Sequence, residues 1–148
     1  MVLFFLSFLI LEKKLNISTK NSENLYQIFG INTTLKDYQL CFLINDFFGI
    51  ETRLLDTGDI RDNFSVFGDI IDEIKVLLIQ NILRDNTSVF SKLKSFEYII
   101  VVNENEEQFV DIVKSFEAKD EILYISKVED KFVLSKEQNI INQLLALL

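Results

Sequence analysis

EYIIVV, residues 97–102, is the stretch that decides the fold. Four consecutive apolar residues follow Glu97 and Tyr98, so a strand here would carry apolar side chains on both faces. Such a run is typical of a central strand in a sheet that is covered on both sides. We therefore expect the middle of a sheet at residues 97–102, with Glu97 at one end and Glu104 just beyond the other.

The sequence that follows predicts two helices separated by two strands. Residues 106–117 repeat apolar side chains at the i, i+3, i+4, i+7 spacing of an amphipathic helix. Ser135 and Gln138 form a capping-box pattern that predicts the start of a final helix. The two strands between these helices are expected at residues 122–126 and 131–134.

The clearest helix before the central strand is at residues 35–48. Thr34 is its expected N-cap, with Asp37 three residues on, and Gly49 suits the left-handed residue that ends many helices. Apolar residues occupy most of the surface of this helix. This pattern predicts a buried helix that packs on a sheet and is covered by the N-terminal run or by a second subunit.

Strands are also expected on both sides of this helix. Residues 13–18 alternate polar and apolar side chains as a short strand does, and the polar residues 19–24 are expected as a loop. Turns or bulges are expected at Gly58-Asp59 and Gly68-Asp69. The strands that these pairs punctuate are expected at residues 50–55, 64–67 and 74–82.

The expected order of elements is therefore β-α-β-β-β-β-α-β-β-α. Neighbouring strands with few helical crossovers predict the α+β class, with a single mixed or antiparallel sheet and helices packed mainly on one face. The chain has no repeat, linker or break in composition. We expect one α+β domain at residues 12–148, preceded by an apolar N-terminal extension at residues 1–11.

Residues 2–11, VLFFLSFLIL, are apolar apart from Ser7. A membrane-spanning helix needs about 20 such residues, and an export signal needs a basic residue before the run and a cleavage site after it. We prefer three interpretations of this run over a signal or a membrane anchor. It is an extension outside the fold, a product of a start codon read upstream of the true one, or a strand. We expect a cytoplasmic protein, with membrane association or export through residues 2–11 as the alternative.

The composition excludes several classes of chemistry. The chain has 148 residues and is 49% hydrophobic, so it can bury a core without disulfides or metals. Its net charge of −8, from 15 basic and 23 acidic residues, has the wrong sign for nucleic-acid binding. It has no His, one Cys and four Gly, which leaves no His-based catalysis, zinc site or glycine-rich phosphate loop. We predict no metal, no cofactor and no nucleic-acid partner.

A resemblance to a known family begins at residues 30–31, GI, and continues through residues 35–41, LKDYQLC. This pattern resembles the first motif of the IPExxxVDY family of small bacterial proteins. The second half of the signature that names the family is similar to residues 96–98, FEY, in this chain. The first half departs from it, because residues 90–92, FSK, stand in place of Ile-Pro-Glu and reverse the charge.

The resemblance extends over about residues 12–142. FSVF at residues 64–67 and LSKEQN at residues 134–139 are similar to two further segments of the family, in the same order along the chain. The family has no established activity. The resemblance therefore implies an uncharacterised, cytoplasmic bacterial protein, and it implies no site residues.

One candidate binding group opens the helix at residues 35–48. Lys36, Asp37 and Tyr38 lie where free backbone N–H groups and the helix dipole favour an anion or a partner. The structural interpretation, in which Asp37 caps the helix, Tyr38 packs and Lys36 is solvated, is the simpler one.

The second candidate group is at the central strand. Glu97 and Glu104 bracket this strand, and paired carboxylates can act as acid and base if one of them is desolvated. Tyr98 is adjacent, but no spacing forces these groups into one site, and charges at strand ends explain them as well. Cys41 has no His to pair with and apolar neighbours, so we expect a buried, structural thiol.

Three functional hypotheses follow. The leading one is a non-enzymatic protein-binding or scaffolding domain, with homo-oligomerisation as one form of it. The second is an enzyme that uses carboxylate, Lys and Tyr groups, drawn from Lys36, Asp37, Glu97 and Tyr98. The third is a membrane-associated protein that uses residues 2–11. We expect no membrane partner, so this hypothesis ranks last.

Overall fold

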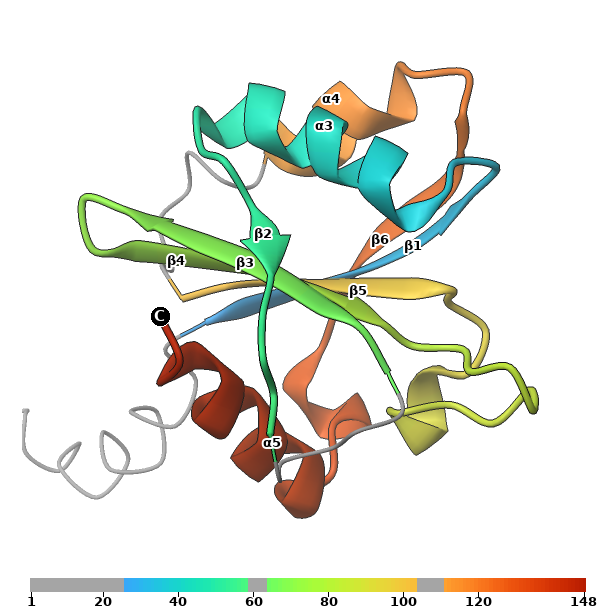
Figure 1. Ribbon diagram of the computed structural model, residues 1–148. Coiled ribbons are helices and arrows are strands. Elements are labelled where there is room, and N and C mark those ends of the chain that lie inside the picture. Colours follow the sequence, from blue (N-terminus) through green and yellow to red (C-terminus); the bar gives the residue numbers. More distant parts are fainter. Residues whose placement is uncertain (1–25, 59–63, 104–110) are drawn as a thin grey trace, which may run out of the picture.

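The computed structural model describes residues 26–58, 64–103 and 111–148. In these residues six strands form one antiparallel sheet with the spatial order β2-β3-β4-β5-β1-β6 (Figure 1). The strands are β1 (Gln27–Thr33), β2 (Arg53–Leu54), β3 (Val66–Ile71), β4 (Ile74–Gln80), β5 (Tyr98–Val102) and β6 (Ile122–Val128). The expected α+β class, with a single sheet, is confirmed, and the sheet is antiparallel.

Helices lie on both faces of the sheet. They are α3 (Asp37–Phe48), α4 (Asp111–Glu117) and α5 (Ser135–Leu145), with 3-10 turns η2 (Ser91–Leu93) and η4 (Asp130–Phe132). Figure 1 shows α3 and α4 on one face, as expected for most of the helices, and α5 on the opposite face. Two hydrophobic clusters result, one on each side of the sheet.

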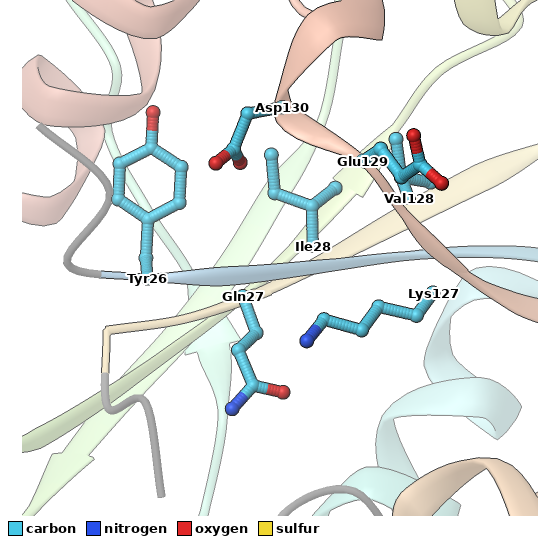
Figure 2. Close-up of a pocket in the computed structure, with 7 residues that line it drawn as sticks. All are labelled: Tyr26, Gln27, Ile28, Lys127, Val128, Glu129 and Asp130. Atoms are coloured by element: carbon cyan, nitrogen blue, oxygen red, sulfur yellow. The ribbon is translucent and has the colours of Figure 1, made fainter. Parts of the chain in front are cut away.

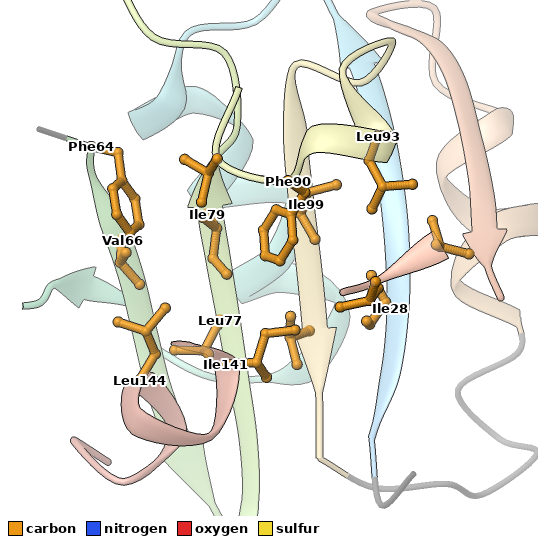
Figure 3. Packing of buried hydrophobic residues seen from close by; sticks show 14 of the residues in the cluster. Ile28, Phe64, Val66, Leu77, Ile79, Phe90, Leu93, Ile99, Ile141 and Leu144 are labelled. Carbon is orange, nitrogen blue, oxygen red and sulfur yellow. The ribbon is translucent and has the colours of Figure 1, made fainter. Parts of the chain in front are cut away.

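The prediction of a central strand at residues 97–102 is confirmed by β5, which lies between β4 and β1. Ile99 and Val101 belong to the cluster under α5, and Ile100 and Val102 belong to the cluster under α3 and α4. All four side chains are fully buried. Figure 3 shows Ile99 beside Phe90, on the face where α5 packs.

The strand that sequence patterns miss is β1, the inner neighbour of β6. The first strand was expected at residues 13–18, which lie outside the described residues. Gln27, Gly30 and Asn32 interrupt the apolar pattern of β1, so its sequence does not alternate as a half-buried strand does. Gly30 is required by packing, because an added Cβ would lie 2.5 Å from two ring carbons of Phe96.

Several expected boundaries are wrong. Residues 131–134 form no strand, because Phe132 N donates to Glu129 O and closes the turn η4 at 3.0 Å. Of the strand expected at 50–55, only Arg53–Leu54 forms β2, although Leu55 N also donates to Val66 O of β3 at 2.8 Å. Gly68 is not a turn but lies inside β3. The hairpin turn falls at Asp72 and Glu73, both with positive φ, as a two-residue hairpin requires.

The helix starts also differ from those expected. The N-cap of α3 is Lys36, whose N–H donates to the side-chain oxygen of Gln39 at 2.9 Å. Thr34 lies two residues before this N-cap, and its backbone N–H donates to Glu121 O, which ties the turn to the start of β6. The expected left-handed end at Gly49 is confirmed, with φ of 70°.

The outward face of α3 differs from the fully buried helix that was expected. Leu40 and Ile44 are buried against the sheet, and Phe47 packs edge-on against Phe116 of α4 at 5.8 Å. Phe42 is nevertheless 67% exposed. Within the described residues, the helix therefore has the sheet and α4 as neighbours but no third layer over its outer ridge.

Two buried polar side chains hold the long connection between β4 and β5. Asn81 donates from Nδ2 to Leu93 O and Phe96 O and accepts from Phe90 N, all at 2.8–2.9 Å. These bonds order residues 90–96 of the connection. They also place Phe90 against the sheet and Phe96 over Gly30.

The second of these side chains, Glu137 of α5, fixes the same segment to the helix. Its carboxylate accepts from Ser91 N at 2.9 Å and from Leu134 N at 3.0 Å. Glu137, and not the expected Gln138, therefore completes the capping box of α5.

Candidate functional site

Three of the predicted site residues lie close together where β5 begins beside α3. Tyr98 is the first residue of β5 and is half-buried. Burial raises the pKa of the Tyr98 phenol, and the charges of Asp37 and Glu97 raise it further. The phenol therefore stays protonated to a higher pH than usual, which is the opposite of what a tyrosine base or nucleophile needs.

Glu97 is used by the fold. Its carboxylate accepts from Thr33 N at 2.9 Å, and its own backbone N–H donates to Ile31 O at 3.1 Å and to the Asn32 side chain at 2.8 Å. The residue thus joins the end of β1 to the start of β5. This arrangement matches the structural interpretation of Glu97.

The start of α3 has little capacity left for an anion. The N–H of Lys36 is taken by Gln39, and the N–H of Tyr38 donates to the Asp37 carboxylate at 2.6 Å. Lys36 and Tyr38 are exposed, and the nearest charges at Tyr98 are negative. The local field therefore disfavours the anion that a free helix N-terminus attracts.

A polar cavity of about 650 Å³ lies next to this group. Asp37 lines it together with Gln80 of β4 and Arg84 and Asp85 of the following turn. Of the four residues proposed for an enzyme, only Asp37 is among its lining residues. The cavity therefore does not collect the predicted Lys, Glu and Tyr groups into one catalytic site.

Two further predictions concern the thiol and metals. Cys41 is buried, as expected, and burial raises the pKa of its thiol, so the thiolate is disfavoured. A hydrogen bond with Thr52 opposes this rise, and the charge of Asp37 adds to it. In the part of the chain that the structure describes, no three acidic or cysteine side chains lie close enough together to hold a metal ion.

A second hollow, of about 430 Å³, lies at the end of the β1–β6 pair. Figure 2 shows Tyr26, Ile28 and Asp130 on one side of β1, and Gln27 and Lys127 on the other. The hollow thus wraps around the strands and is not an enclosed pocket. Its lining includes Lys127 on the outermost strand of the sheet.

The outer edge of β6 is the most open backbone surface of the described sheet. Alternate residues of an antiparallel strand direct both backbone groups to the same neighbour. The backbone groups of Ile31 point to β5, because its carbonyl accepts from Glu97 N. The backbone groups of Gly30, one position earlier, therefore point to β6, where the register partner of Gly30 is Ser126. Ser126 in turn directs its backbone groups inward to β1.

The residues on either side of Ser126 consequently direct their backbone groups outward. These residues are Ile125 and Lys127, and no other described strand lies beyond β6. Two large side chains stand beside this edge, Leu123 at 65% exposed and Tyr124 at 54% exposed. The edge therefore combines unpaired backbone groups with exposed apolar surface, the combination that templates added strands.

Tyr124 is held in place from the sheet side. Its ring stacks on Phe96, with centroids 5.9 Å apart and ring planes 9° from parallel. Phe96 in turn fills the space above Gly30 of β1. The orientation of Tyr124 is therefore set by the connection between β4 and β5 before any partner arrives.

Sequence reasoning placed a strand at residues 122–126 but missed this edge. An edge position depends on strand order, and the strand order depends on β1, which the sequence patterns did not reveal. Lys127 next to an apolar strand is the one local signal, because edge strands are enriched in Lys.

Comparison with known proteins adds no assignment. No protein-family model matches the chain, and no curated protein matches it. Among the described residues, no helix has the length and apolar character that crossing a bilayer requires. The apolar run at residues 2–11 lies outside the described residues, so its predicted role stays a prediction.

Proposed function

We propose that this chain is a protein-binding domain that takes up an extended segment of its partner along the outer edge of β6. The observation that carries the proposal is a seven-residue edge strand whose outward backbone groups have no described strand beside them. An extended segment added there gains a row of main-chain hydrogen bonds, which is a recurring mode of peptide recognition.

Exposed side chains beside the edge supply selectivity. Leu123 and Tyr124 offer apolar contacts to alternate residues of an added strand, and Lys127 offers a charge at the far end. Tyrosine is one of the residue types that contribute most of the energy of protein interfaces. The raised pKa values at Tyr98 and Cys41 support binding over catalysis, as does the neighbouring cavity, which Asp37 alone of the four enzyme candidates lines.

The resemblance to the IPExxxVDY family leads us to propose a cytoplasmic bacterial setting as well. Residues 90–92, which stand in place of the first half of the family signature, have a structural role in this chain. Phe90 is fully buried in the cluster under α5, and the Ser91 N–H is bonded to Glu137 of that helix. Residues 90–92 would then stabilise the fold that presents β6, and they would not themselves form the binding surface.

Site-specific photo-crosslinking tests the proposal. A photoreactive residue replaces Leu123 in one variant and Leu54 in the other, because these leucines are 65% and 63% exposed and lie on opposite edge strands. After irradiation in an extract of the native cell, we expect protein adducts from position 123 and few from position 54. Equal yields from both positions, or no adduct from position 123, would contradict the proposal.

A further inference from the structure

We infer that the segment bound at this edge carries an aromatic residue directly preceded by an acidic one, and that the aromatic ring enters a groove beside Ser126. The inference rests on the proposed function and names the chemistry of the partner. It uses the regular part of β6, residues 124–128, which pair in unbroken register with residues 28–32 of β1.

The groove has a volume of about 240 Å³ and lies next to this part of β6. Its apolar walls are Leu93 of η2, Phe96, Val128 and Phe132 of η4. The first three belong to the cluster under α5 or pack against it, so the groove is on the α5 face of the sheet. Sites for small molecules have volumes of roughly 300–1,000 Å³, so this smaller groove suits a single side chain better than a free metabolite.

Ser126 leaves the space that forms the floor of the groove. Side chains of residues 124–128 alternate between the two faces, with Ile125 in the cluster under α3 and α4 and Val128 in the cluster under α5. Ser126 therefore shares the α5 face with Val128, and it is the small residue beside the Phe96 ring. Its hydroxyl already donates to Lys127 O at 3.2 Å, so an apolar group can cover Ser126 without leaving the hydroxyl unpaired.

Backbone pairing decides which residue of an added strand reaches the groove. Lys127 directs its backbone groups outward, and its carbonyl can accept a second bond besides the one from Ser126. In antiparallel addition, the more stable form of pairing, the residue opposite Lys127 forms a hydrogen-bonded pair with it. The next residue of the segment lies opposite Ser126 in a non-hydrogen-bonded pair, where the two chains approach most closely. Its side chain points to the α5 face and into the groove.

The walls of the groove favour an aromatic ring in that position. Phe96 is fixed by its stack with Tyr124, and Phe132 is 41% exposed at the other wall. A ring placed between them would bury apolar surface on both sides and could meet each phenyl group edge-on or offset, the geometries that aromatic pairs prefer.

The charges beside the groove favour an acidic residue before the aromatic one. The residue opposite Lys127 shares its face of the sheet, which Figure 2 shows to be the side of β1 where Gln27 lies. Opposite charges in directly facing positions stabilise strand pairing. Lys92 adds a positive charge at the groove, whereas Glu129 is already paired with Lys131 at 3.3 Å. The net charge of −8 is spread over the whole chain, and screening limits its reach to about 8 Å at physiological ionic strength.

Binding of labelled peptides to the full chain tests the aromatic position. The probe is fluorescein-labelled Thr-Thr-Glu-Phe-Val-Thr-Thr, and the control probe has Ala in place of Phe. In fluorescence polarisation, we expect the Phe probe to have a Kd about tenfold lower than that of the Ala probe. Equal binding of the two probes, or no binding of the Phe probe at about 1 mM, would overturn the inference.

Two variants show whether the preference for Phe comes from the groove. Ser126→Ile fills the groove with a side chain that strands accommodate well, and the two probes should then bind equally. Phe132→Ala removes one wall outside the sheet and should reduce the preference to about threefold, which provides a test even if Ser126→Ile does not fold. A preference that stays tenfold in either folded variant would contradict the inference.

Charge reversal tests the acidic position. Lys127→Glu should raise the Kd of the Phe probe about fivefold, and a probe with Lys in place of Glu should regain that loss on the variant. Arg84→Glu makes the same change in net charge beside the polar cavity of Asp37 and should change the Kd less than about twofold. Equal losses in both variants, or no recovery with the Lys probe, would exclude the acidic residue opposite Lys127.

The two proposals fail in different ways. If position 123 cross-links another protein but the Phe probe binds no better than the Ala probe, the aromatic residue is excluded and the edge remains a binding site. If position 123 cross-links nothing, the proposed function fails as well.

Discussion

The two edges of the sheet carry nearly equally exposed leucines and differ in almost everything else. Leu54 belongs to β2, which is only two residues long and ends one side of the sheet. Leu123 belongs to β6, which is seven residues long and ends the other. A two-residue edge offers too few backbone groups to template a strand, whereas β6 offers a regular stretch from Tyr124 to Val128 beyond its register shift at Leu123. An exposed apolar residue therefore indicates binding only where the backbone beside it is also available.

The strands next to the two edges show a parallel contrast. Gly30 of β1 pairs with Ser126 of β6, and Gly68 of β3 pairs with Arg53 of β2. A Cβ at Gly30 would meet the ring of Phe96, which supports Tyr124. A Cβ at Gly68 would meet Val76 O at 2.9 Å, in the backbone of β4. Each glycine admits a close neighbour, but only the one at Gly30 supports a surface side chain.

Proline substitutions along β6 test which backbone groups point outward, and they carry the largest expected effect. Ser126→Pro removes an N–H that faces β1 and should lower the free energy of unfolding by at least about 3 kcal/mol. Lys127→Pro removes an outward N–H and should lower it by less than about 1 kcal/mol. Chemical denaturation of both variants measures the difference. Equal losses in unfolding free energy would contradict the assignment of outward backbone groups to Lys127.

Asn81→Ala tests the support that the β6 edge receives from the connection between β4 and β5. The change leaves Leu93 O, Phe96 O and Phe90 N without their partner, so we expect a loss of about 2–3 kcal/mol in unfolding free energy. Asn142→Ala, on the exposed side of α5, is the matched control and should change it by less than about 0.5 kcal/mol. A similar small loss for both would show that Asn81 does not order this segment.

Gly30→Ala and Gly68→Ala sharpen the contrast between the two edges. Each should destabilise the fold by about 2 kcal/mol through overpacking, measured by thermal or chemical unfolding. Only Gly30→Ala displaces Phe96 and should also weaken association through β6, measured as a lower yield of adducts cross-linked from position 123. Weakened association in Gly68→Ala alone would indicate that the β2 edge is the binding edge.

Tyr98, on the central strand β5, lies away from both edges and serves as a reference for them. Its titration is expected to have the smallest effect on stability among these predictions. Its pKa is raised from 10.0 by burial and nearby negative charge, so the folded chain holds the phenol proton more tightly than the unfolded chain does. The associated stability is present below pH 10 and is lost as the pH rises through the folded pKa. Phenolate absorbance of the wild type minus Tyr98→Phe should show this late titration, and a midpoint below 10 would contradict it.

The sequence predicts those parts of the fold that depend on local pattern. The uninterrupted apolar run of β5, the left-handed end at Gly49 and the apolar repeat of α5 all appear in the structure. The strand β1 could not be predicted, because its non-apolar residues make contacts that are distant in sequence: Gly30 leaves space for the Phe96 ring, and Asn32 bonds to the backbone of Ser95 and Glu97.

The candidate site shows the same division. Asp37, Glu97 and Tyr98 were chosen for their chemistry, and the structure does bring them close together. It also ties Glu97 to Thr33, a use that depends on the neighbouring strand. The β6 edge depends entirely on strand order, which is a property of the whole sheet. Local sequence carries no signal for it beyond Lys127.

Amide hydrogen exchange along β6 tests most directly whether this edge is open. In a dilute sample, the N–H groups of Ile125 and Lys127 should exchange rapidly, while that of Ser126, directed to β1, should be protected. Protection of all three residues alike in the dilute sample would show that the edge is already covered, and would contradict the account.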